Sequence, residues 1–225
     1  MEKTGCEAER SRVTARICMF AMYMGFGVEA LKNWKRLPIV NTSFVVINVL
    51  VYLVGMFTRG LPVYYGRMDV QSVLFRGEYW RIVTAMFLHG SVDHLFSNML
   101  VLFFLGAMIE QEIGHICYGI VYLLSGIGGN LVSLYMKLVS FNTAASLGAS
   151  GVVFGMDGVL LALGLFSNRK LQNISAPRVF LMIALSLYSG FVGSHIDNAA
   201  HVGGLVTGFV LGSLVSIVRR RFIHR

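Results

Sequence analysis

Two residues of this chain have side chains of the kind that carry out acyl transfer. Ser150 lies in the stretch Gly148-Ala149-Ser150-Gly151, and His201 lies near the start of a later apolar segment. A serine hydroxyl is a weak nucleophile until a base accepts its proton, and a neutral histidine accepts one near physiological pH. The two residues therefore form a candidate pair, with Ser150 as nucleophile and His201 as general base.

A second pair of polar residues is suited to stabilise the negative oxygen of a tetrahedral intermediate, which needs hydrogen-bond donors. His94 and Asn98 are four residues apart, so they share one face of a helix. Together with the backbone N–H of Ser150, they would supply three donors. Asp197, four residues before His201, is expected in the loop before the last apolar segment, so the sequence favours a dyad over a triad.

The surrounding sequence is apolar enough to require a membrane. Of the 225 residues, 56% are hydrophobic and only 13% are charged. A helix needs about 20 mostly apolar residues to cross the hydrocarbon, and every span must be helical because an unpaired backbone group there costs several kcal/mol. We therefore predict an all-α membrane protein, a bundle of six transmembrane helices. Its spans are expected at residues 39–57, 95–109, 116–138, 148–166, 179–191 and 199–218.

The basic residues predict the orientation of this bundle. Fourteen of the 19 Lys and Arg lie in residues 1–38, 168–178 and 219–225, so both termini are expected in the cytoplasm, with the protein in the cell membrane. Spans two, four and six then begin at the outer face, which brings the four polar residues named above to a similar depth. The net charge of +8 does not indicate nucleic acid, because the basic residues gather at span ends and form no stripe with stacking aromatics.

The chain divides into three parts. Residues 1–37 form a cytoplasmic N-terminal segment, in which the apolar run 17–28 favours an interfacial amphipathic helix over a seventh span, the alternative that would move the N-terminus outside. No removable signal peptide is indicated. Residues 38–218 form the six-helix domain, whose aromatic-rich connection 58–93 is expected at headgroup depth. Residues 219–225 form a basic cytoplasmic tail.

Small residues predict which spans pack together. Gly204, Gly208 and Gly212 form a stripe along span six, and Gly151 and Gly155 form another on span four. Small residues at four-residue spacing let helix backbones approach closely in a membrane. Packing of the two stripes would bring the serine and the histidine within hydrogen-bond reach. The plainer interpretation is that the glycines serve packing alone and that the histidine bonds to a neighbour.

Five features, found in order along the chain, resemble the sequence pattern of the rhomboid intramembrane proteases over about residues 38–218. The Gly-x-Ser-Gly pattern alone is weak evidence, but the matches fall on the expected helices and together are specific. They are Trp80-Arg81 in the first loop, His89, His94 and Asn98 around the start of span two, Glu110 at its end, Gly148, Ser150 and Gly151 in span four, and His201 with Gly203, Gly204 and Gly208 in span six.

The resemblance implies a serine endopeptidase that cleaves the transmembrane helices of single-pass or polytopic membrane proteins near the outer leaflet, without a cofactor or metal. Ser150 would be the nucleophile and His201 the base, with His94 and Asn98 as oxyanion donors. One position departs from the family: where a tyrosine often follows the serine by four residues, this chain has Phe154. The resemblance assigns structural roles to Trp80, Arg81, His89 and Glu110.

Other classes of protein fit the sequence less well. A rhomboid-like binder of membrane-protein clients without activity usually lacks the nucleophile or the base, and both are present here. A metal-dependent intramembrane protease needs a two-histidine helix motif with its glutamate, which is absent. An aspartyl type needs paired aspartates, whereas Asp157 stands alone within the spans. A transporter would show an internal repeat or an interrupted helix pair, and the sequence shows neither.

Two further expectations concern a gate and the lone acid. The short loop 193–198 and span 179–191 are expected to gate the site, because a lid is needed to control water and admit a helix. Asp157 lies seven residues after Ser150 and so on the same face of span four. Without a basic partner at that depth it is expected to be uncharged and structural, linking span four to a neighbour.

Overall fold

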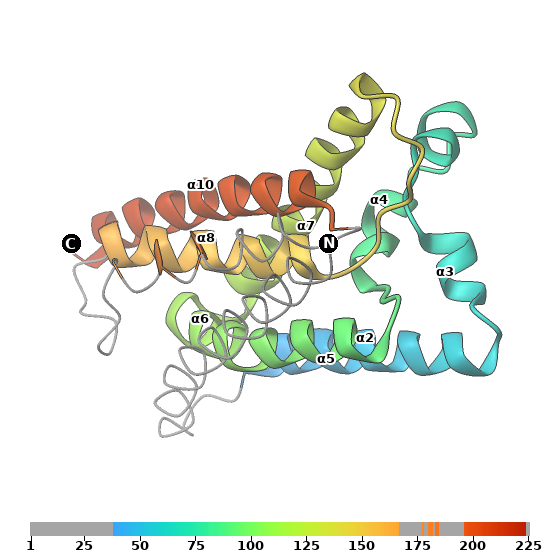
Figure 1. Ribbon diagram of the computed structural model, residues 1–225. Coiled ribbons are helices and arrows are strands. Elements are labelled where there is room, and N and C mark those ends of the chain that lie inside the picture. The colour runs from blue at the N-terminus through green and yellow to red at the C-terminus, as the bar shows by residue number, and fades with distance from the viewer. Residues whose placement is uncertain (1–37, 167–176, 178–179, 182, 185–195, 224–225) are drawn as a thin grey trace, which may run out of the picture.

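The computed structural model describes residues 38–166, 177, 180–181, 183–184 and 196–223, and Figure 1 shows their arrangement. This part of the chain is helical, and an isolated bridge between Met68 and Ser146 is the one extended pairing within it. The elements are α2 (Ile39–Phe57), α3 (Leu61–Gly66), η1 (Gln71–Phe75), α4 (Arg81–Thr84), η2 (Ala85–Phe87), α5 (Val92–Val101), η3 (Leu102–Gly106), α6 (Ala107–Ile113), α7 (His115–Val139), α8 (Ser150–Phe166) and α10 (Asn198–Ile223).

Four of the described helical segments are long and apolar enough to cross a membrane. They are Ile39–Phe57, Val92–Ile113, His115–Val139 and Asn198–Arg219, and the shorter apolar helix Ser150–Phe166 lies among them. The prediction of a multi-pass helical membrane protein is therefore confirmed. Most of the predicted span 179–191, the interfacial helix at 17–28 and the first half of the gate loop 193–198 lie outside the described residues.

Where the structure describes them, the bounds of the predicted spans agree with the observed helices to within five residues, and two of the starts differ for a local reason. Span two begins earlier than expected, at Val92, because the Ser91 hydroxyl accepts a hydrogen bond from the His94 N–H and caps the helix. Span four begins two residues later than expected, at Ser150, because Gly148 has a φ of +128° that a helix does not allow.

The directions of the helices place their polar ends together. In Figure 1, α5, α8 and α10 all run from right to left, so the three helices begin on the same side. Helix α8 lies beside α10 over its whole length, and this is the most extensive contact between described elements. The common direction of these three helices agrees with the prediction for spans two, four and six.

Helices α8 and α10 pack backbone against backbone. A Cβ atom on Gly204 would lie 2.0 Å from the carbonyl oxygen of Gly151, and one on Gly208 would lie 1.9 Å from that of Gly155. On Gly212, a Cβ would lie 2.9 Å from the Cα atom of Val159. No side chain fits into these spaces, so the predicted packing of the two glycine stripes is confirmed.

Buried amides join the first span to its neighbours. The Asn41 side chain donates to the carbonyl oxygen of Leu102 (2.9 Å) and accepts from the Tyr118 hydroxyl (2.7 Å). This contact falls at the first residue of the π-helical segment η3. A Cβ on Gly106 would lie 2.2 Å from the Asn41 amide oxygen, so a glycine is needed to admit this side chain.

Candidate active site

Ser150 and the ring of His94 meet around Gly148. Ser150 is the first residue of α8, and the N–H of Gly148 is tied to the Ala85 carbonyl oxygen at 2.9 Å. A Cβ atom on Gly148 would lie 2.7 Å from Cε1 of His94 and 3.8 Å from Oγ of Ser150. The glycine is therefore required both by its positive φ and by the space that the histidine ring occupies.

His201 lies over the first turn of α8. Its ring is buried and stacks on Phe154, with 4.3 Å between ring centroids and 17° between ring planes. Phe154 is one turn after Ser150 on α8, so the ring of His201 is held on the same side of that helix. Within the described residues, Nδ1 of His201 has no hydrogen-bond partner.

The segments that carry Ser150 and His201 are held together by the close approach of α8 and α10. A Cβ on Gly151 would lie 3.4 Å from the carbonyl oxygen of Ala200, the residue before His201. Residues adjacent to the candidate nucleophile and the candidate base are thus in direct contact. The structure thus places the His94 ring beside Gly148 and Ser150, and the His201 ring on Phe154 one turn further along α8.

Asn98 is engaged with His89. The Asn98 Nδ2 atom lies 3.1 Å from Nε2 of His89, and the rings of His89 and His94 lie 5.0 Å apart. Burial lowers the pKa of His89 to about 3, with a smaller contribution from His94, so the ring is neutral at physiological pH. With Asn98 donating, the proton of His89 resides on Nδ1. His89 therefore orients the amide of Asn98, a contact that the sequence does not reveal.

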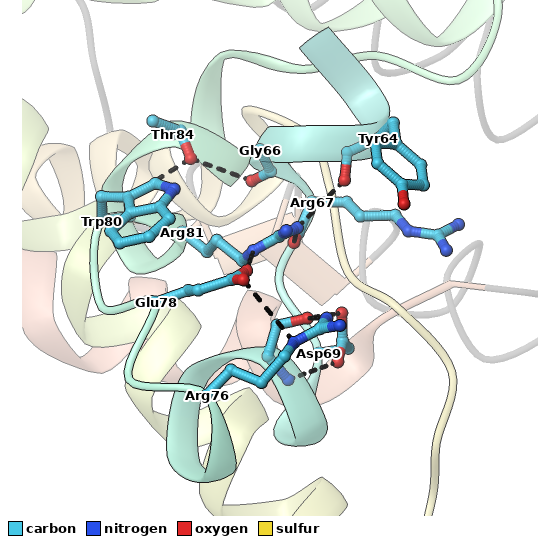
Figure 2. Close-up of polar contacts among 10 residues, drawn as sticks. Tyr64, Gly66, Arg67, Asp69, Arg76, Glu78, Trp80, Arg81 and Thr84 are labelled. Carbon is cyan, nitrogen blue, oxygen red and sulfur yellow. Dashed lines mark hydrogen bonds and ion pairs between the residues drawn. The ribbon is translucent and has the colours of Figure 1, made fainter. Parts of the chain in front are cut away.

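The Trp80-Arg81 pair organises the first loop, and Figure 2 shows its surroundings. Arg81 is buried and pairs with Glu78, and its guanidinium donates to the carbonyl oxygens of Tyr64 (3.1 Å) and Arg67 (2.8 Å). The Arg81 guanidinium thus binds two backbone carbonyl groups and one carboxylate of the loop. This fits the structural role that the resemblance implies. Trp80 itself is exposed.

Other aromatic side chains of the same loop are also exposed. Exposed aromatic rings are typical of a segment that lies at headgroup depth. The exposed residues are Tyr64, Tyr65, Phe75 and Tyr79.

Glu110 joins the end of span two to the start of span one. Its buried carboxylate accepts hydrogen bonds from the backbone N–H groups of Val40 (3.0 Å) and Asn41 (2.6 Å) and also contacts Nδ1 of His115. The first N–H groups of a helix have no partner within it, and a carboxylate satisfies them and interacts well with the helix dipole. The structural role expected of Glu110 has a physical basis here.

Asp197 makes contacts with distant residues that its position in the sequence does not indicate. It precedes α10, as expected, but its carboxylate accepts hydrogen bonds from the hydroxyls of Ser133 and Ser146. These partners are 64 and 51 residues away in the chain, so no local pattern could have revealed them.

Among the described residues, no group of three or more His, Cys, Asp or Glu is placed to hold a metal ion.

The described fold and site define a helical, multi-pass membrane protein with a serine and two histidines gathered where three helices begin. The family model of the rhomboid domain matches residues 76–218. The chain therefore belongs to the rhomboid family.

Curated relatives agree with this assignment. RHOMBOID-like protein 4 of Arabidopsis thaliana is 32% identical over 229 residues, covering 86% of this chain and 56% of the relative. RHOMBOID-like protein 1 of the same plant is 39% identical over 160 residues, covering 70% and 39%. Rhomboid protease GluP of Bacillus subtilis is 29% identical over 185 residues, covering 80% and 35%. The chain thus spans about half the length, or less, of these relatives.

Proposed function

We propose that this chain is an intramembrane serine endopeptidase that uses a dyad of Ser150 and His201. The observation that carries the proposal is the convergence at the start of α8. The Ser150 hydroxyl and the His94 ring lie around Gly148, and the His201 ring stacks on Phe154 one turn further along. The name of Rhomboid protease GluP states a protease activity for one relative, which supports the same reaction here.

The first half of the reaction forms an acyl-enzyme. His201 accepts the proton of the Ser150 hydroxyl as the oxygen attacks the carbonyl carbon of the scissile peptide bond. The resulting tetrahedral intermediate carries a negative oxygen. It collapses when the bond to nitrogen breaks, and the leaving amine takes the proton from His201. Water, with its proton accepted by the same histidine, then hydrolyses the ester and regenerates the serine.

Donors for the negative oxygen come from the start of α5 and α8. We assign His94, the Asn98 amide and the backbone N–H of Ser150 to this role, because preorganised donors in a site without bulk water stabilise developing charge strongly. The pairing of Asn98 with His89 uses one amide hydrogen. Asn98 retains a second N–H for the substrate, and His89 acts by fixing the direction of that amide.

Substrates and location follow from the site and the charge distribution. The dyad lies where helices begin, so we propose cleavage of transmembrane helices of single-pass or polytopic proteins near the outer leaflet. A helix must unwind to offer its carbonyl, and glycine or proline in the substrate lowers that cost. We propose that the six-helix domain spans 38–218 in the cell membrane, with segments 1–37 and 219–225 in the cytoplasm.

The test compares single variants in a reconstituted cleavage assay with a model transmembrane substrate. Ser150→Ala and His201→Ala should each abolish cleavage, and the double variant should be no worse than either single variant, because a dyad acts as a unit. Ser213→Ala is the matched control, since this hydroxyl bonds only within α10, to the Phe209 carbonyl at 2.7 Å. Full activity of Ser150→Ala would refute the serine mechanism.

A second measurement separates catalysis from client binding. A fluorophosphonate probe should label the native protein and not the Ser150→Ala variant. If the native protein binds a transmembrane substrate but neither cleaves it nor is labelled, the chain is a non-proteolytic binder and the proposal is wrong.

A further inference from the structure

The carboxylate of Asp197 connects the two helices of the candidate dyad through contacts made outside the reacting groups. Its oxygen Oδ2 accepts from the hydroxyls of Ser133 on α7 and Ser146 in the loop before α8, and Nζ of Lys137 lies 3.6 Å away. Its other oxygen, Oδ1, accepts from the backbone N–H of Ala200 at 3.1 Å. One side chain thus contacts α7, the loop before α8 and the start of α10.

On the α10 side, Asp197 fixes the first turn of the helix. The contact from Oδ1 to the Ala200 N–H is that of a helix N-cap, which satisfies a donor that the helix itself leaves unpaired. The carbonyl oxygen of Asp197 also accepts from the His201 N–H at 3.2 Å. Both contacts act on the turn that carries His201.

On the α8 side, the same carboxylate holds a loop that is already fixed to the first loop of the chain. Ser146 pairs through its backbone with Met68, at 2.9 and 2.7 Å, and Gly148 donates to the Ala85 carbonyl. Ser146 is four residues before Ser150, so its position determines where α8 begins. The hydroxyl of Ser146 is buried, as is that of Ser133.

The charge of Asp197 strengthens this arrangement. Burial opposes the charged form, but hydrogen bonds from Ser133, Ser146 and the Ala200 N–H, together with the ammonium of Lys137, lower the pKa of Asp197 below its ordinary value. The group is therefore an anion at physiological pH. Hydrogen bonds to a charged acceptor are about twice as strong as neutral ones.

We propose that Asp197 is a positioning residue of the candidate site: it sets the register of the helix carrying His201 against the loop that leads into Ser150. The inference rests on the proposed dyad. It differs from a triad aspartate, because the contacts of Asp197 go to serine, lysine and backbone groups. Among the described residues, Nδ1 of His201 has no hydrogen-bond partner, so it donates none to this carboxylate. The hydrogen bonds of Asp197 act on the helix start.

The experiment measures kcat, KM and the rate of Ser150 labelling by a fluorophosphonate in the full-length protein. Asp197→Ala removes every contact of the side chain and should lower kcat and the labelling rate roughly a hundredfold with little change in KM, the cost of about 1 Å of misplacement. Asp197→Asn keeps the cap but not the charge, and should recover part of that loss. The Ser133→Ala/Ser146→Ala double variant keeps Asp197 and its cap, and should also lower the labelling rate about tenfold.

The matched control is Glu112→Gln. Glu112 lies on α6 and contacts the end of α10 that is remote from the dyad. Glu112 pairs with Arg219 at 3.1 Å, and its side chain is 21% exposed, against 20% for Asp197. This change also removes a carboxylate that ties α10 to a neighbour, but far from the dyad. It should leave kcat and labelling within twofold of the native protein.

The outcomes separate the two proposals. A native protein that is neither labelled at Ser150 nor active would overturn the dyad and this inference with it. A native protein that is labelled, with Asp197→Asn and the double serine variant labelled at the same rate, would overturn the positioning role alone. An equal loss in Glu112→Gln would also overturn it, because the effect would then be one of general helix anchoring.

Discussion

Replacement of Gly204 by alanine tests whether backbone contact between α8 and α10 controls the chemistry. The added Cβ would lie 2.0 Å from the oxygen, 2.8 Å from the carbon and 3.2 Å from the Cα atom of Gly151. All three are backbone atoms, so no side chain can rotate out of the way. Carbon–oxygen contacts between helices normally measure at least about 3.3 Å, so the two helices must separate locally by roughly 1.3 Å.

That separation occurs beside both members of the candidate dyad. Gly151 follows Ser150 in the chain, and Gly204 is about one turn after His201. A misplacement of about 1 Å can cost on the order of a hundredfold in rate, and overpacking of a tight interface costs about 1–3 kcal/mol. We expect Gly204→Ala to reduce cleavage roughly a hundredfold and to lower the melting temperature.

Gly164→Ala provides the matched control for this variant. A Cβ on Gly164 would meet nothing within 4 Å, and the residue lies in α8 itself. Alanine is favoured over glycine in a helix by up to about 1 kcal/mol, so this variant should be active and no less stable than the native protein. If Gly204→Ala cleaves a reconstituted transmembrane substrate as fast as Gly164→Ala, the geometric reasoning is wrong.

Three further predictions concern the polar groups around the site. His94→Ala and Asn98→Ala should each slow cleavage by roughly ten- to a thousandfold, the range for loss of one oxyanion donor, and unchanged rates in both would return them to a structural role. Asp157→Asn should retain most activity and stability, because an amide also donates and accepts, whereas Asp157→Leu should lower the melting temperature; a folded but inactive Asp157→Asn protein would indicate a part in proton handling. The pKa of His89 is about 3 in the folded protein, against an ordinary value of 6.5. The neutral, buried ring therefore contributes its full stability above pH 6.5. This stability is lost as the pH falls toward 3, by about 3 kcal/mol at pH 4.5. Thermal melts from pH 7.5 to 4.5 should show a smaller acid loss for His89→Gln than for the native protein, and identical losses would contradict the assignment.

The positions of the helices could be read from the sequence because they depend on local composition. The span predicted at 39–57 coincides with α2, and the glycine stripes of spans four and six face each other as their spacing indicated. Both features repeat at the period of a helix, so they are visible within about twenty residues. The sequence also predicted that α5, α8 and α10 run in the same direction, because successive spans cross a membrane in opposite directions.

Contacts between distant residues could not be predicted in the same way. The contact of η3 with the amide of Asn41 joins residues that are 61 positions apart in the chain. The direction of Asn98 depends on the tautomer of His89, and the role of Asp197 depends on two serines in other segments. Serine and asparagine occur in many surroundings, so their type alone does not identify a partner.

The burial of α8 has a consequence for the biosynthesis of the protein. From Gly151 to Leu160 every residue of this helix is buried, and Asp157 lies near its centre. An aspartate at the centre of an isolated helix opposes entry into the bilayer by about 3 kcal/mol, and the glycines of α8 offer little apolar surface in return. We expect α8 to settle in the bilayer only when its partners are available, α10 among them. Because α10 is synthesised later, the serine and its histidine would reach their places together, at the end of assembly, and an incomplete chain would carry no working site.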